Sequence, residues 1–463
     1  MNSSRFLRAA GYAAALSAIA LAPFTAGAQT ASGASSDEIT ALREQIRLLD
    51  QKLKTLERNL ELKDEAAAAE AKKQPKLSLG DRGLSITSAD KAFTLRVGAL
   101  VQTDFRYFAN DDADTGRDGF LFRRVRPTLR GTVNEKFDYR ITPDFAGNSG
   151  SDFALLDATV TYNHSPEFAV TVGKFKAPFD LERLQGGGNL TFIERAYPTI
   201  LGPNREVGVL VGGSLADKRL SYAASIGNGT TDGGSTASNS DDALEGTARL
   251  FATPFVNDKD SALAGLGFGV AVSYGDKTSG APRNYSSNGQ QTIFSWDGGP
   301  TGTGKQIRFS PQASYYYGPF GLLASYVSSR QELQRAGGTI HETFTNEGWL
   351  VSGSYVLTGE KASYNGVTPA NPFKIGGEGW GAFEIAARVS SLDLDDDIFT
   401  TGFGNLNSDV TEAISYGVGL NWYLTRNVKA VLNYELSKFD GGAAGGNDRQ
   451  NEHAIFSRLQ LNF

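Results

Sequence analysis

Apolar and polar residues alternate with a period of two in about sixteen segments between Phe93 and the C-terminal Phe463. In the last segment Ile455 and Leu459 fall on one face, whereas Arg458 falls on the other. Side chains alternate between the two faces of a strand, so each segment predicts a strand with one mostly apolar face. Such a chain must bury that face in a sandwich core or turn it toward lipid, and other features decide between the two.

The N-terminus has the layout of a secretory signal peptide, which we expect to cover residues 1–28. Arg5 and Arg8 form a basic start, residues 9–24 are apolar, and residues 26–28 read Ala-Gly-Ala, a small-residue cleavage site. A membrane-anchor helix is the alternative, but the apolar run is short and rich in alanine for one. Export combined with the strand pattern favours a barrel that faces lipid.

Composition agrees with this interpretation. No later stretch approaches the ~20 consecutive apolar residues of a spanning helix, but a transmembrane barrel hides its membrane character because every second residue faces water. The chain has no cysteine, which excludes a disulfide framework. Its net charge of −6 argues against nucleic acid as a partner.

A heptad pattern occupies residues 36–66, between the signal peptide and the strands. The apolar positions follow each other at spacings of three and four, and they are Ile39, Leu42, Ile46, Leu49, Leu53, Leu56 and Leu60. A single short coil cannot bury such a stripe, so we expect a coiled-coil oligomerisation helix. An amphipathic helix lying on the barrel is the alternative. Residues 67–92 are expected to be a linker.

The expected fold is all-β: a 16-stranded antiparallel transmembrane β-barrel over residues 93–463, preceded by the coiled-coil helix. We expect strands near 93–107, 120–133, 136–145, 154–162, 168–174, 206–213, 219–227, 244–254, 266–274, 306–316, 320–328, 345–357, 380–392, 413–423, 427–438 and 453–463. Short and long connections alternate, as in bacterial barrels. The exception is 358–379, which is either a long excursion or a missed hairpin. About sixteen strands leave an aqueous channel.

The charges expected to face this channel are concentrated in the second strand. Arg124, Arg126 and Arg130 lie at alternate positions, with Arg123 close by. The neighbouring strands add Arg96, Arg106 and Arg140. Guanidinium groups stay charged and bind oxyanions through two parallel donors, so a column of them makes successive anion sites. The alternative is that they pair with carboxylates, among them Asp157, and stiffen the wall.

A second basic segment is the long connection between residues 174 and 206. Its cations are Lys174, Lys176, Arg183, Arg195 and Arg205, and a glycine triplet occupies residues 186–188. Loops of this length are usually functional or disordered. We expect the loop to fold into the channel as a constriction, and an external cap is the alternative.

The chain resembles the phosphate-selective porins of the O/P type. The matching segments are Phe122-Arg123-Arg124-Val125-Arg126, Leu156-Asp157-Ala158, residues 172–179 with Leu181-Glu182, residues 355–360, and residues 381–384 running to Arg388 and 390–393. The resemblance implies sixteen-stranded homotrimers with an inward third loop, an arginine staircase and an N-terminal coil that trimerises in the periplasm. Family members differ in preferring phosphate or polyphosphate.

The leading hypothesis is therefore a passive outer-membrane porin for anions, with inorganic phosphate or other small anions as solutes. Its expected surroundings are outer-membrane lipid and lipopolysaccharide, and it needs no cofactor. A general or sugar-type porin with structural arginines is the alternative. An enzyme is disfavoured because His164, His341 and His453 show no serine partner arrangement. The acidic run 393–397 lacks the glycine and ligand spacing of a calcium loop, so no metal site is expected.

A structural tether, in which the N-terminal coil grips the cell wall, is the last hypothesis. It would be an added role, recognised if deletion of residues 36–66 weakens the envelope while conductance persists.

Overall fold

The computed structural model describes residues 35–109, 116–147, 153–239 and 241–463. The predicted signal peptide lies outside them. Helix α1 runs over Ser36–Ala71 and begins with a capping box, in which Ser35 and Glu38 each accept a hydrogen bond from the other's backbone N–H. The reciprocal bonds satisfy donors that a helix start leaves unpaired. All seven apolar heptad positions are exposed in the single chain.

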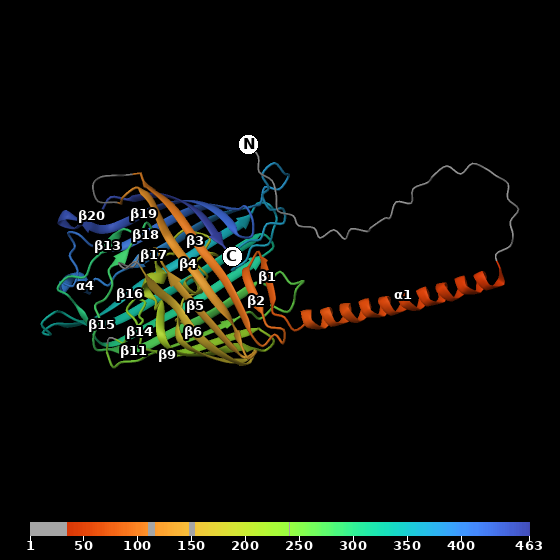
Figure 1. Ribbon diagram of the computed structural model, residues 1–463. Coiled ribbons are helices and arrows are strands. Elements are labelled where there is room, and N and C mark those ends of the chain that lie inside the picture. The colour runs from red at the N-terminus through yellow and green to blue at the C-terminus, as the bar shows by residue number, and fades with distance from the viewer. Residues whose placement is uncertain (1–34, 110–115, 148–152, 240) are drawn as a thin grey trace. The chain divides into compact units, whose positions relative to one another are not determined.

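Among the described residues, sixteen antiparallel strands close into a barrel (Figure 1). They are β3 (Thr94–Phe108), β4 (Gly119–Val133), β5 (Phe137–Asp144), β6 (Ala154–Ser165), β7 (Phe168–Lys176), β8 (Arg205–Leu215), β9 (Leu220–Gly227), β10 (Glu245–Ala252), β11 (Leu266–Lys277), β14 (Thr301–Tyr317), β15 (Phe320–Gln334), β16 (His341–Val356), β17 (Ala382–Asp393), β18 (Val410–Tyr423), β19 (Val428–Ala443) and β21 (Glu452–Asn462). The pairing of β21 with β3 closes the sheet, and the predicted fold is confirmed.

Each predicted strand coincides with one of these sixteen. The alternation that predicts them arises because one face of every strand meets lipid and the other faces the lumen. Short strands in the connections were not predicted. β1 (Lys76–Gly80) and β2 (Gly83–Thr87) form a hairpin that extends the start of β3. β12 (Tyr285–Ser286) and β13 (Thr292–Phe294) pair within the β11–β14 connection, and β20 (Asn447–Asp448) pairs with β19.

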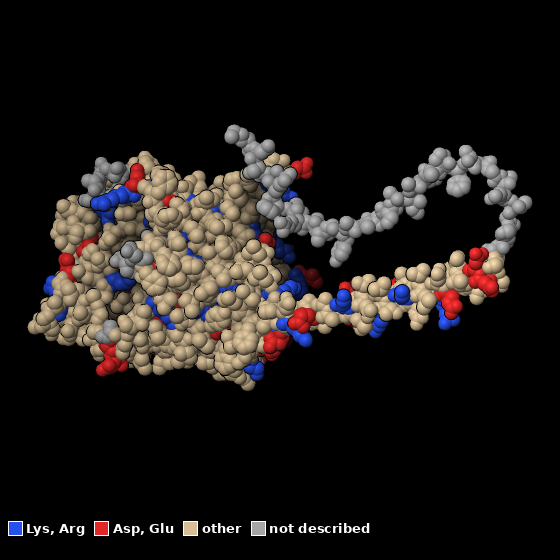
Figure 2. Space-filling model, in the orientation of Figure 1, with Lys and Arg blue, Asp and Glu red and all other residues tan. Residues whose placement is uncertain are grey.

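The outer wall is apolar, and on the face visible in Figure 2 uncharged residues cover most of the barrel. In β17 the outward residue Ile385 is 45% exposed, whereas its inward neighbour Glu384 is 4% exposed. A lipid-facing wall needs this arrangement, and closure leaves no edge strand whose backbone groups would lack partners in lipid. In the described part of the chain, no helix has the length and apolar character to cross a membrane.

Short turns and long loops lie at opposite ends of the barrel, as the alternating connections require. The exception predicted at 358–379 is a long excursion, because no strand lies between β16 and β17. These residues, 357–381, are called the long turn below. The long turn reaches into the lumen, where the Tyr364 hydroxyl donates to the carbonyl of Leu181 at 2.6 Å and Gln185 donates to the carbonyl of Tyr364 at 2.8 Å.

The connection between β7 and β8, residues 177–204, also lies inside the barrel and is called the inner loop below. It contains the one-turn helices α2 (Leu181–Leu184) and α3 (Pro198–Leu201). Its residues Phe179, Tyr197 and Leu201 join the largest buried apolar cluster of the barrel. That cluster also holds Tyr285 and Phe294 of the β12–β13 hairpin, inward residues of β11 and β15–β19, and residues of the β17–β18 connection around α4 (Asp397–Thr400). One side of the lumen is therefore filled by packed side chains, and a cavity lies on the other side.

Candidate functional site

An open cavity of about 1220 Å³ lies in the lumen, bounded by β3–β7, the inner loop, the long turn and the end of β21. Among the described residues that line it, thirteen are lysine or arginine and three are aspartate. The chain as a whole is acidic, so this excess is local. A passage with walls of one charge sign concentrates ions of the other sign.

The arginines of β4 line this cavity because of strand alternation and one bulge. Arg124, Arg126 and Arg130 occupy alternate positions and face it. Arg123 would face outward by alternation. However, the β3–β4 register shifts there, so that Gln102 opposes Arg124 and Thr103 opposes Phe122. The extra residue of a bulge re-aims a side chain, and Arg123 faces the lumen as well.

Arg124 is buried without an acidic partner. Its side chain is 2% exposed, and its Nη1 donates to Oε1 of Gln102 at 2.6 Å. Its Nε has no hydrogen-bond partner, and within the described ranges no carboxylate comes within ion-pair distance. The inner loop passes directly over it at Gly187, where a Cβ atom would lie 3.1 Å from Nε of Arg124. A buried guanidinium without a counter-charge is costly, and a bound anion would relieve that cost.

Further along the wall, three arginines lie side by side. Arg96 of β3 opposes Arg130 of β4, and Arg130 opposes Arg140 of β5. All three are exposed to the cavity. Arg140 has Asp157 at 3.6 Å, whereas Arg96 and Arg130 form no ion pair with any described residue. Like charges on directly opposed residues are destabilising, so this row is not explained by stability of the sheet.

Other arginines on the same wall are neutralised. Arg126 donates to Asp144 at 2.8 Å. Arg205 donates to Asp157 at 2.9 Å, so Asp157 serves Arg205 and Arg140 together. The alternative, in which arginines pair with carboxylates and stiffen the wall, therefore fits Arg126, Arg140 and Arg205. It does not fit Arg124, Arg96 and Arg130.

The cations near the inner loop mostly hold its backbone. Lys176 donates to the carbonyls of Arg183, Leu184 and Gln185 at 2.7–3.2 Å. Arg195 donates to the carbonyls of Glu182 and Gln185, and Arg183 donates to that of Thr199. Lys176, Arg183 and Arg195 line the cavity, whereas Lys174 belongs to β7 and does not.

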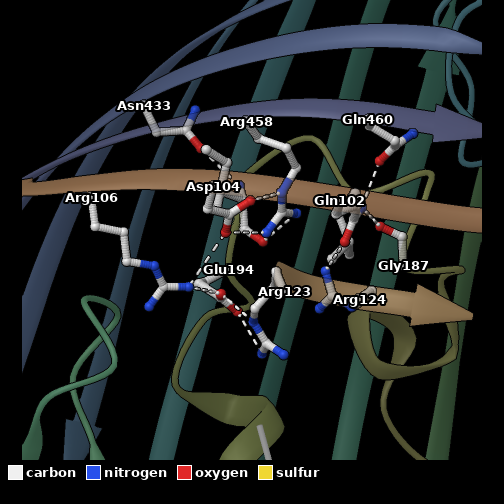
Figure 3. A network of polar contacts seen from close by, with 12 residues as sticks. Gln102, Asp104, Arg106, Arg123, Arg124, Gly187, Glu194, Asn433, Arg458 and Gln460 are labelled. Carbon is white, nitrogen blue, oxygen red and sulfur yellow. Dashed lines mark hydrogen bonds and ion pairs between the residues drawn. The ribbon is translucent and has the colours of Figure 1, made fainter. Parts of the chain in front are cut away.

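A polar network anchors the inner loop to β3, β4 and β21 (Figure 3). Glu194 lies between Arg106, at 2.6 Å, and Arg123, whose Nε and Nη2 donate to it at 2.6 and 3.0 Å. Asp104 accepts two bonds from Arg458, at 2.6 and 2.7 Å. Burial raises the pKa of Glu194, but Arg123 and Arg106 lower it by more, so its pKa lies well below the ordinary value.

Sequence reasoning missed several members of this site. Arg82 and Arg426 lie in turns and Lys429 is the second residue of β19, yet all three line the cavity. Turns have no periodicity from which the inward direction of Arg82 and Arg426 could be inferred, whereas alternation along β19 could have identified Lys429. Arg106 was expected in the ladder; it faces the lumen but does not line the cavity, because Glu194 covers it. In residues 35–109, 116–147, 153–239 and 241–463, no group of three or more acidic or histidine side chains is placed to bind a metal.

Comparison with known proteins supplies the family. Residues 95–463 match the family model "Phosphate-selective porin O and P". The chain is 26% identical to Porin O of Pseudomonas aeruginosa over 419 residues, which cover 82% of this chain and 91% of that protein. The outer membrane channel DcaP of Acinetobacter baumannii has a similar fold, with a TM-score of 0.52 and 12% identity over 80% of this chain and 98% of DcaP. Because the family model spans almost the whole barrel, this chain belongs to the phosphate-selective porin O and P family of outer-membrane channels.

Proposed function

We propose that this porin conducts small oxyanions passively along the arginines of its lumen, with phosphate or polyphosphate as the preferred solutes. The observation that carries the proposal is the set of cavity-lining arginines without carboxylate partners among the described residues: Arg124, Arg96 and Arg130. Guanidinium groups offer planar paired donors that match the oxygens of phosphate-like anions. A cationic solute would be repelled by them, and a neutral solute would gain hydrogen bonds but no charge attraction.

The arrangement suits stepwise transfer. Arg124 lies under the inner loop at Gly187, Arg126 follows two residues later, and the row of Arg96, Arg130 and Arg140 comes next on the same wall. Conduction requires sites strong enough to admit an ion and weak enough to release it. Asp144 partly neutralises Arg126 and Asp157 partly neutralises Arg140, which would keep an anion from being trapped at either position.

The orientation and assembly are part of the proposal. The turns between most strands are short at the end where α1 joins the barrel in sequence, and short turns of bacterial barrels face the periplasm. The coil then lies in the periplasm. Its exposed heptad stripe supports self-association, and we expect a homotrimer.

Single-channel recording tests the proposal. In a chloride gradient the reversal potential should show anion preference, and added phosphate should reduce chloride current in a saturable way. The double variant Arg124→Gln and Arg126→Gln should weaken phosphate block at least tenfold, since a hydrogen bond to a charged group contributes about 1.5–3 kcal/mol. Cation preference, or block by maltose-type sugars and not by phosphate, would support the general or sugar-type porin.

A further inference from the structure

Among the described inner-loop residues, Glu194 is the one whose carboxylate forms an ion pair with the guanidinium of an arginine that lines the cavity. It is 3% exposed, and its two oxygens accept three bonds from Arg106 and Arg123 (Figure 3). The bond lengths of 2.6–3.0 Å and the paired approach of Arg123 are those of an arginine binding a free carboxylate or phosphate. A side chain of the protein thus occupies the position of a bound anion.

The carboxylate of Glu194 is not the only attachment of the inner loop at this point among the described residues. The backbone N–H of Ile193 donates to Asn433 at 2.7 Å, and the carbonyl of Ile193 accepts from Arg458 at 3.0 Å. The carbonyl of Glu194 itself accepts from Arg388 at 2.7 Å. Three bonds from three different strands therefore fix the backbone at this point, and the Glu194 carboxylate is an addition to them.

The position of Arg123 makes exchange with a solute possible. Arg123 precedes Arg124, which is buried beside the cavity without an acidic partner within the described ranges. Both side chains line the cavity, so an oxyanion that enters it at Arg124 can also reach Arg123. There it would compete with Glu194, because the Arg123 donors that bind Glu194 cannot serve both anions at once.

We infer that Glu194 is a tethered competitor of the permeating oxyanion: its carboxylate neutralises Arg123 when the site is empty and limits how tightly an oxyanion can be held there. This inference rests on the proposed anion conduction and deepens it, since it assigns a residue that sets affinity at the head of the arginine column. The tether protects the channel from being blocked by its own substrate.

The experiment compares phosphate block of chloride current in the full-length channel and in Glu194→Gln. The amide keeps the shape but donates where the carboxylate accepts, so it no longer neutralises Arg123. We expect phosphate to bind about tenfold or more tightly in the variant, because a hydrogen bond between charged groups contributes about 1.5–3 kcal/mol and phosphate no longer has to displace one. Each blocking event should also last longer.

Glu245→Gln is the matched control. Glu245 is also a buried glutamate held by two cations, Arg308 at 2.7 Å and Lys277 at 3.3 Å, and none of the three lines the cavity. We expect its phosphate block to equal that of the unmodified channel. If Glu194→Gln does not insert into bilayers, Glu194→Asp serves, because it keeps the charge but withdraws it from Arg123 by one methylene, and block should tighten by a smaller factor.

The outcomes separate the two proposals. Unmodified channels without anion preference or phosphate block would overturn the proposed function. Anion-selective channels in which Glu194→Gln leaves block unchanged, weakens it, or merely raises chloride conductance without a change in phosphate affinity would overturn the tethered competitor and leave the proposed function standing.

Discussion

Inward arginines occur in two different settings in this barrel. Arg308 of β14 is fully buried, donates to Asp232 and Glu245 at 2.7 Å each, and also reaches the carbonyl of Thr230. Arg130 of β4 faces the cavity, has no described acidic partner and lies between two other arginines. The same residue type is thus neutralised at Arg308, where the lumen is filled, and lacks a described carboxylate partner at Arg130, where the lumen is open.

The difference separates structure from transport. Arg308 and Lys277 together balance the charges of Asp232 and Glu245, so Arg308 holds the wall and the β9–β10 connection together. An arginine that faces water without a carboxylate contributes a field to the passage. We therefore expect substitutions on the two sides of the lumen to affect different measurements.

The largest expected effect is on stability at Arg308. Arg308→Gln leaves Asp232 and Glu245 buried without their shared partner. Removal of one partner of a buried ion pair costs about 3–5 kcal/mol. The free energy of unfolding of the refolded barrel in detergent, measured by urea titration, should fall by that amount. A loss below about 1 kcal/mol would show that water or a rearranged side chain replaces the guanidinium.

An intermediate effect is expected at Arg130, with the opposite pattern. Arg130→Gln relieves repulsion from Arg96 and Arg140, and directly opposed like charges cost about 0.2–1 kcal/mol. Unfolding stability should therefore stay the same or rise slightly, whereas conductance in dilute chloride should fall. The same substitution at Arg126, which is paired with Asp144, provides the comparison: it should lower stability. If Arg130→Gln destabilises the barrel as much as Arg126→Gln, the row is structural.

The sequence predicts one part of this contrast and not the other. Alternation identifies all sixteen strands and the inward direction of Arg124, Arg126 and Arg130, because a closed sheet permits only two directions for each residue. Strict alternation alone would turn Arg123 outward, and the sequence does not reveal the bulge that turns it toward the lumen. The partners of Arg123 and Arg308 could not be predicted in the same way, because Glu194 and Asp232 lie in connections whose path through the lumen follows from tertiary packing.

The inner loop illustrates why the rest was not predictable. The cations in and beside it are conspicuous in the sequence. However, Arg195 of the loop and Lys176 at the end of β7 donate hydrogen bonds to backbone carbonyls of the loop. The glycine triplet, whose role the sequence did not specify, lets the loop lie against the wall: a Cβ atom at Gly188 would approach Asn462 to 2.6 Å. The long turn could be recognised as unusual by its length but not as a segment that enters the lumen.

The smallest expected effect is that of mild acid on the competition between Glu194 and a blocking anion. Arg123 and Arg106 hold the pKa of Glu194 well below its ordinary value of 4.5 despite burial. A carboxyl group with a lowered pKa contributes stability above its unfolded pKa and loses it only as pH falls through the lowered value. Between pH 7 and 5 Glu194 should therefore stay ionised and keep competing for Arg123. Sulfate, whose charge is constant over this range, is a suitable blocking ion.

Sulfate block should accordingly differ between the unmodified channel and Glu194→Gln by the same factor at pH 7 and at pH 5. A change shared by both channels arises from other titrating groups and cancels in the ratio. Block that tightens on acidification in the unmodified channel alone, and approaches that of Glu194→Gln, would mean that Glu194 takes up a proton in this range. Such a result would mean that Arg123 holds Glu194 only weakly. Arg123 would then lack an ionised partner at pH 5, as Arg130 does at both pH values.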